Sequence, residues 1–180
     1  MKALLVIDML KEFIYGNKNQ RVIRKKQTKK LIQKLRKVID LAYKKNIPVI
    51  YINCSHKKTD PCVRISGKHA MKGTKGAQVI DELKPTKKDL IVKKIAFDGF
   101  YKTRLEKLLR KLKIKEIYLT GVQTDCCVRE TGASGAYRGF KVFIIEDCCA
   151  TNIKVNHDTS IMFFVKTNAG KIVNSKNLKW

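Results

Sequence analysis

Long apolar runs, CxxC pairs and internal repeats are all missing from this 180-residue sequence. Without a run of about 18 apolar residues we expect no membrane-spanning helix and no membrane partner. The opening segment MKALLVIDML is interrupted by Asp8, so we expect a buried strand there instead of a secretory signal. The lack of a CxxC pair argues against a zinc ribbon or a thioredoxin-type site. No composition break divides the chain, and we expect a single domain over residues 1–180.

Acidic side chains are also scarce, because 15 Asp and Glu oppose 40 Lys and Arg and leave a formal net charge of +25. The cations are 32 lysines and eight arginines, spread along the whole chain. Nucleic-acid sites favour clustered arginines with interleaved aromatic residues. We therefore expect a solvated, lysine-rich surface and no specific nucleic-acid partner. Such a surface still attracts anions, and a noncatalytic or nucleic-acid-binding role stays as the alternative to an enzyme.

Six cysteines occur, and four of them form two adjacent pairs. A vicinal disulfide is strained, which argues against a peroxide-sensing pair at Cys126 and Cys127. With no secretory signal expected, the pattern predicts reduced thiols in the cytoplasm. We expect Cys126, Cys148 and Cys149 to pack in the interior, while the role of Cys62 stays open.

Strand-like and helix-like segments alternate along the chain. Short apolar runs predict strands at 3–8, 47–53, 89–94, 116–122, 141–148 and 171–175. Helical spacing of apolar residues predicts helices at 28–46, 103–112, from about 125, and 156–170. A long polar stretch at 54–77 is predicted to be a functional loop. This alternation predicts an α/β protein with a three-layer α-β-α, Rossmann-like fold and a mostly parallel six-stranded sheet.

Chemically useful side chains follow three of the predicted strands. Asp8 ends the first strand, Lys94 ends the third, and Cys126 and Cys127 follow the fourth. Ligands of open parallel sheets bind beyond the carboxyl ends of the strands, so an acid, an amine and a thiol can meet in one crevice. A helix start and a nearby ammonium both favour a thiolate. A carboxylate can accept the thiol proton and return it to a leaving group.

Five segments within residues 3–136 form an ordered series of motifs: ALLVIDMLKEF, YINCSHKKTDP, GKHAMKGTKGAQVIDELKP, KKIAFDGFYKTRL and GVQTDCCV. Together they resemble the isochorismatase-like cysteine hydrolases, a family that includes the nicotinamidases. The fourth segment is similar to K-x-x-Y-S-A-F-x-x-T-x-L, which places the family's lysine on Lys94. The fifth is similar to G-V-x-T-D-x-C-V, which places the nucleophile on Cys127.

The resemblance implies a hydrolase that cleaves the C–N bond of a small amide or ureido substrate, with nicotinamide as one candidate. Cys127 would attack the carbonyl and form a thioester acyl-enzyme, Asp8 would take the thiol proton, and Lys94 would hold the thiolate. The Val122–Gln123 peptide would be cis, and the backbone N–H groups of Gln123 and Cys127 would form the oxyanion hole. No cofactor is required for this chemistry, and the family often forms homodimers or tetramers.

A metal site is a further implication of the resemblance. Nicotinamidases hold a divalent ion with an Asp-x-His pair and a later His, and the matching positions here are Cys54, His56 and His69. A cysteine and two histidines could bind zinc. The loss of the family's Asp equally predicts a metal-free protein, with the histidines lining the pocket.

Other departures and side chains bear on the substrate. Leu10 and Lys11 stand where relatives commonly carry a Gln of the site, so the substrate can differ from theirs. The rings of Phe13, Phe97 and Phe100 are candidates for an aromatic pocket wall around a planar substrate, with ordinary core packing as the equal alternative. His157 is expected at the surface.

Overall fold

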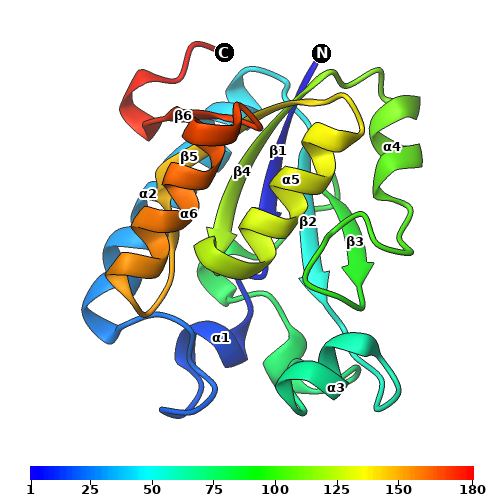
Figure 1. The fold of residues 1–180 in the computed structure, drawn as a ribbon, viewed down its shortest axis with the longest axis vertical. Coiled ribbons are helices and arrows are strands. Elements are labelled where there is room, and N and C mark those ends of the chain that lie inside the picture. Colours follow the sequence, from blue (N-terminus) through cyan, green and yellow to red (C-terminus); the bar gives the residue numbers. More distant parts are fainter.

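The computed structural model describes all 180 residues and contains one six-stranded sheet with helices on both faces (Figure 1). The strands are β1 (Lys2–Ile7), β2 (Val49–Cys54), β3 (Leu90–Lys94), β4 (Glu116–Val122), β5 (Lys141–Ala150) and β6 (Lys171–Val173). The helices are α1 (Lys11–Tyr15), α2 (Lys25–Lys44), α3 (Pro61–Ser66), α4 (Leu105–Lys111), α5 (Arg129–Tyr137) and α6 (Lys154–Thr167). Every pair of neighbouring strands is parallel, which confirms the predicted α/β fold.

Some boundaries differ from the prediction. The sequence does not predict α1 or α3, because helices of five and six residues are too short to leave a periodic pattern. The helix expected over 28–46 begins at Lys25, and the Gln27 side chain accepts a hydrogen bond from the Arg24 N–H at 3.3 Å at its first turn. The segment 54–77, predicted as a loop, contains α3.

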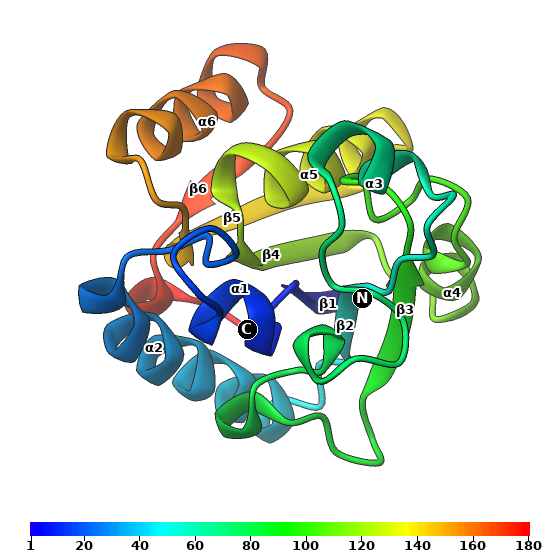
Figure 2. The same cartoon turned by 90° about the horizontal axis from the view of Figure 1, so that it is seen from below.

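The sheet separates two apolar cores. In β1, Leu4 and Val6 face the core that contains α2, whereas Leu5 and Ile7 face the core beneath α4, α5 and α6. Figure 2 shows α2 on one side of the sheet and α5 and α6 on the other. Burial on both faces explains why the strands read as continuous apolar runs. None of the helices combines the length and apolar character that crossing a membrane requires.

The strand order places a crevice beside the central strand. The order is β3-β2-β1-β4-β5-β6, so the chain leaves β1 on one side and returns to its other side at β4. In Figure 1 the carboxyl ends of these strands point toward the end of the molecule that carries α1 and α3. A reversal of strand order is where ligands of open parallel sheets bind, and it lies here between the ends of β1 and β4.

Gly121 permits the close approach of β4 to β1 next to this crevice. Its φ is +109°, and a Cβ atom at this position would lie 2.0 Å from the carbonyl oxygen of Ile7. Gly139 also has a positive φ, +78°, but a Cβ there would meet nothing within 4 Å. A substitution at Gly139 therefore introduces backbone strain alone, whereas a substitution at Gly121 adds a steric clash to that strain.

We expect Gly121→Ala to lower the free energy of unfolding by about 3–5 kcal/mol, because it adds a backbone clash to the strain of a positive φ. Gly139→Ala, the control, is expected to cost only about 1–2 kcal/mol. Urea unfolding monitored by circular dichroism measures both values. Equal losses for the two variants would contradict this account of Gly121.

Candidate active site

Three buried side chains from separate strand ends meet at the carboxyl edge of the sheet. Asp8 follows β1, Lys94 ends β3, and Cys127 lies in the π-helical turn Thr124–Val128 between β4 and α5. The Lys94 Nζ atom is 2.9 Å from Oδ2 of Asp8 and 3.3 Å from Sγ of Cys127. Asp8 and Lys94 are fully buried, and Cys127 is 6% exposed. The structure thus brings together the acid, the amine and the thiol that the sequence places at strand ends.

The backbone around Asp8 fixes the direction of its side chain. The chain leaves β1 by a left-handed turn at Asp8, whose φ is +51°. The Asp8 N–H donates to the Ile52 carbonyl at 3.0 Å, and the Leu10 N–H donates to the Asp8 carbonyl at 2.7 Å. The N–H of Cys54 donates to Oδ1 of Asp8 at 2.7 Å, which leaves Oδ2 for the Lys94 ammonium.

The electrostatics favour a proton on Asp8 and a negative charge on Cys127. Burial raises the pKa of Asp8 to about 7, which Lys94 opposes and the neighbouring Cys127 reinforces. The pKa of Cys127 lies well below its usual range, because the neighbouring Cys126 and Cys54 thiols and the Lys94 ammonium stabilise its thiolate against the effect of burial. Burial alone would lower the pKa of Lys94, but the negative groups beside it raise that pKa well above its ordinary value.

A cavity of about 270 Å³ opens onto the Cys127 sulfur. Its lining includes Phe13, Phe97, Gln123, Cys126 and His69. The volume lies near the lower end of small-molecule sites, which span about 300–1,000 Å³. A buried thiol beside a carboxyl and an ammonium, open to a small cavity, has the parts needed for nucleophilic attack on a carbonyl.

The isochorismatase domain family matches residues 2–175, nearly the whole chain. The chain belongs to the isochorismatase family. Nicotinamidase 3 of Arabidopsis thaliana is 30% identical over 166 residues, which cover 89% of this chain and 78% of that protein.

Solved structures of family members share the fold. N-carbamoylsarcosine amidase from Thermoplasma acidophilum has a TM-score of 0.89 and 35% identity, with 99% of each chain covered. The pyrazinamidase of Pyrococcus horikoshii in complex with zinc has a TM-score of 0.84 and 25% identity, with 96% of this chain and 98% of that chain covered. The predictions of the family and of a hydrolase are therefore confirmed.

The aromatic wall of this isochorismatase-family member consists of two of the three predicted rings. Phe13 and Phe97 line the cavity, but Phe100 does not. The Phe100 ring stacks on Phe140 with 5.9 Å between centroids, and the Arg138 guanidinium lies 5.0 Å from its centroid. Phe100 therefore belongs to the core, which corrects its proposed place in the pocket.

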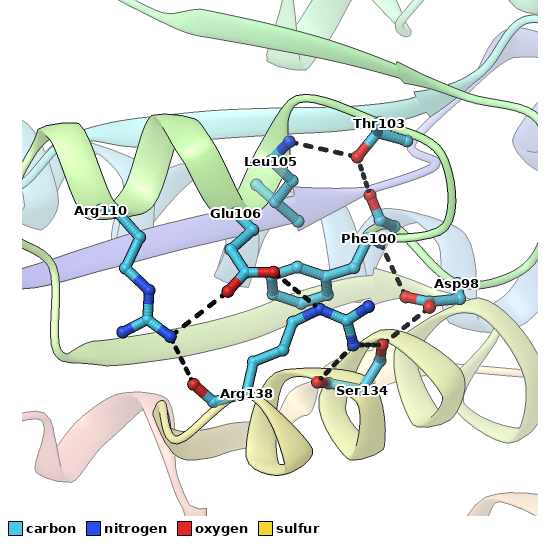
Figure 3. Close-up of polar contacts among 9 residues, drawn as sticks. Asp98, Phe100, Thr103, Leu105, Glu106, Arg110, Ser134 and Arg138 are labelled. Atoms are coloured by element: carbon cyan, nitrogen blue, oxygen red, sulfur yellow. Dashed lines mark hydrogen bonds and ion pairs between the residues drawn. The ribbon is translucent and has the colours of Figure 1, made fainter.

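A polar network surrounds the Phe100 ring (Figure 3). Arg138 donates to Oε2 of Glu106 at 3.1 Å and so joins α5 to α4. Ser134 donates to Oδ2 of Asp98 at 2.7 Å, and Oδ1 of the same carboxylate accepts from the Phe100 N–H at 2.7 Å. This network fixes the segment that follows Lys94 and supports the site from outside.

The turn after β4 has the features that the family resemblance implies. The Val122–Gln123 peptide is cis. Gln123 lines the cavity, and its backbone N–H has no hydrogen-bond partner within the chain. Gln123 therefore offers a free backbone donor in the turn whose residues line the cavity together with Cys127.

Two side chains lie closer to the site than predicted. Cys126 lines the cavity beside Cys127 and does not point to the other side of the turn. His157 is half-buried, with Nδ1 2.9 Å from the hydroxyl of Thr124, and is therefore not a free surface residue. Cys126 and Thr124, the partner of His157, both belong to the π-helical turn.

Glu12 is a structural residue of the site that the sequence does not reveal. Its carboxylate accepts from the Ala70 N–H at 2.9 Å and from the Gln20 amide at 3.3 Å. It thereby ties α1 to the loop that carries His69. An acidic side chain in the first turn of a helix gives no sequence signal that distinguishes this role from an exposed charge.

The three metal candidates lie near one another. Sγ of Cys54 and ring nitrogens of His56 and His69 all lie within 4.8 Å of each other. His56 suits a metal, because it is buried, its Nε2 has no hydrogen-bond partner, its Nδ1 lies 3.5 Å from the Asp60 carboxylate, and burial lowers its pKa to about 4. In His69 the Nδ1 donates to the Gly67 carbonyl at 2.7 Å, so Nε2 is the candidate ligand, and the Cys62 sulfur lies 3.5 Å from that nitrogen.

Cys54 fits less well than the two histidines. A zinc-bound thiol is deprotonated, yet the Cys54 sulfur is already 3.0 Å from the Lys94 ammonium and 3.4 Å from Oδ2 of Asp8. A dication on this sulfur would share it with the ammonium. Two histidines alone fall short of the three protein ligands of a catalytic zinc site.

The buried ion pair makes Lys94 important for stability. We expect Lys94→Met to lower the free energy of unfolding by about 3 kcal/mol, because it leaves the buried anion without its cation. Lys93, the preceding residue of β3, is exposed, and Lys93→Met is the matched control with an expected change within about 0.5 kcal/mol. Chemical denaturation of the two variants tests this; a Lys94→Met protein as stable as the control would rule it out.

Proposed function

We propose that this protein is a cysteine amidohydrolase that cleaves the C–N bond of a small amide or ureido compound. The central support is the position of the Lys94 ammonium, 2.9 Å from the Asp8 carboxyl and 3.3 Å from the Cys127 sulfur at the base of the cavity. The names of its relatives, a nicotinamidase and an N-carbamoylsarcosine amidase among them, point to the same bond type.

The first half of the reaction forms a thioester. The Cys127 thiolate attacks the substrate carbonyl carbon, and the carbonyl electrons move onto the oxygen. The N–H groups of Gln123 and Cys127 donate to that oxyanion, and one such donor commonly lowers the barrier by about 3 kcal/mol. The tetrahedral intermediate collapses, the C–N bond breaks, and the nitrogen leaves with the proton that Asp8 held.

The second half regenerates the thiolate. The Asp8 carboxylate takes a proton from a water molecule, whose oxygen attacks the thioester carbonyl carbon. The C–S bond then breaks, the acid is released, and Cys127 is again a thiolate beside Lys94. Lys94 stays protonated throughout, so that its charge balances one negative group at every stage.

The substrate has to be small. A cavity of about 270 Å³ between Phe13 and Phe97 suits one planar ring or a short ureido acid. Nicotinamide, pyrazinamide, ureidoacrylate and N-carbamoylsarcosine cover these chemistries and form the panel for an ammonia-release assay.

We expect Cys127→Ala to abolish hydrolysis of every panel member that the wild type cleaves, and to remove a single fast-reacting thiol from an iodoacetamide titration. Cys149→Ala is the control, because this buried thiol lies at the end of β5 and its Sγ is 3.7 Å from the Leu119 carbonyl oxygen. No ammonia release by wild type, together with salt-sensitive nucleic-acid binding that Cys127→Ala leaves intact, would instead support the noncatalytic alternative.

The pH profile should report the proton on Asp8. Because burial raises the pKa of Asp8 to about 7, the carboxyl loses, above that pH, the proton that the leaving nitrogen must receive. We expect kcat/KM to fall about tenfold per pH unit on this basic limb. A value of kcat/KM that stays constant up to about two pH units above the pKa of Asp8 would contradict the assigned role of Asp8.

A further inference from the structure

Cys54 contacts two members of the proposed catalytic triad, which consists of Asp8, Lys94 and Cys127. It ends β2 and is 1% exposed. Its backbone N–H holds Oδ1 of Asp8 at 2.7 Å, and its Sγ lies 3.4 Å from Oδ2 of the same carboxyl. The ligand atoms of Asp8, Cys54 and Cys127 all lie within 4.8 Å of one another. A second thiol is therefore part of the buried cluster, in a protein whose proposed reaction uses only one.

The Lys94 ammonium cannot satisfy the cluster alone. It has three N–H donors, and four acceptors surround it: Asp8 Oδ2 at 2.9 Å, the Ala96 carbonyl oxygen at 2.9 Å, Cys54 Sγ at 3.0 Å and Cys127 Sγ at 3.3 Å. A buried charged group left short of donors is destabilised. The Cys54 S–H, whose sulfur is 3.4 Å from Oδ2 of Asp8, is a further donor within reach of this cluster.

Charge balance keeps that hydrogen on Cys54. Lys94 is the one cation in contact with the cluster, and it balances one negative charge, shared between Asp8 and Cys127. A second thiolate would leave net negative charge in a dry site.

We propose that Cys54 is a positioning residue of the reaction: its S–H donates to whichever of Asp8 and Cys127 carries the negative charge, and it is not a metal ligand. This inference rests on the proposed function, because it assigns Cys54 to the proton transfer between those two groups. It also accounts for a thiol at the position where nicotinamidases carry a metal-binding Asp, since a neutral donor adds no charge that a metal must offset.

The test compares Cys54→Ala, which removes the donor, with Cys54→Ser, which keeps an O–H donor. Both retain the backbone N–H that holds Asp8. Cys148→Ala is the control, because Cys148 is a buried thiol in the core on the α2 side and has no hydrogen bond to the triad. Four quantities are measured: the rate of Cys127 alkylation by iodoacetamide as a function of pH, kcat and KM for a cleaved amide, and the zinc content of protein incubated with zinc.

We expect Cys54→Ala to raise the pH midpoint of Cys127 alkylation by about one unit and to lower kcat about tenfold, the loss of about one hydrogen bond to a charged group, with KM changed less than about twofold. Cys54→Ser should reverse most of both effects, and Cys148→Ala should match the wild type. Zinc should stay well below one equivalent in all of them. A merely structural role would not separate kcat from KM or allow rescue by serine.

Other outcomes overturn the inference. The inference fails if Cys54→Ala has the same alkylation behaviour and kcat as the wild type. It also fails if the wild type binds one equivalent of zinc and both Cys54 variants lose it. If Cys54→Ala does not fold, Cys54→Ser decides by its alkylation rate and zinc content. If Cys127→Ala keeps the fast-reacting thiol, the proposed function itself fails; if it loses that thiol but Cys54→Ala has no effect, only the role of Cys54 fails.

Discussion

The contact of the buried Lys94 ammonium with Asp8 and Cys127, which share one negative charge, is the constraint on which the site depends. A fully buried lysine is costly unless it is paired, and here Asp8 and Cys127 pair with it at 2.9 and 3.3 Å. The same contact that stabilises the ammonium also favours a thiolate on Cys127. The stability of the folded chain and the reactivity of the proposed nucleophile therefore have one physical origin.

The sheet topology makes this contact available. Lys94 and Cys127 come from strand ends on opposite sides of β1, and Asp8 sits between them because β1 is the strand at which the order reverses. Gly121 lets β4 approach β1 closely, and the turn that follows carries Gln123 and Cys127 into the crevice. The apolar strands thus act as a rigid support for polar groups placed only at their ends.

Much of this arrangement could be predicted from the sequence. Parallel strands end at one edge, so the positions of Asp8, Lys94 and Cys127 after apolar runs are enough to expect them together. The position of Cys54 in the cluster could not be predicted, since it depends on how far side chains reach across β1. Phe100 was equally beyond prediction, because helical and strand spacing do not say which ring faces a cavity and which faces Phe140. The short helices α1 and α3 leave too little pattern to detect.

The account stands on Cys127 being ionised at neutral pH within this cluster. Its most direct test is the difference in ultraviolet absorbance between wild-type protein and Cys127→Ala at neutral pH, in the band where thiolates absorb and thiols do not. We predict that the wild type shows one additional thiolate, which disappears on acidification. Superimposable spectra for the two proteins at neutral pH would contradict the central claim.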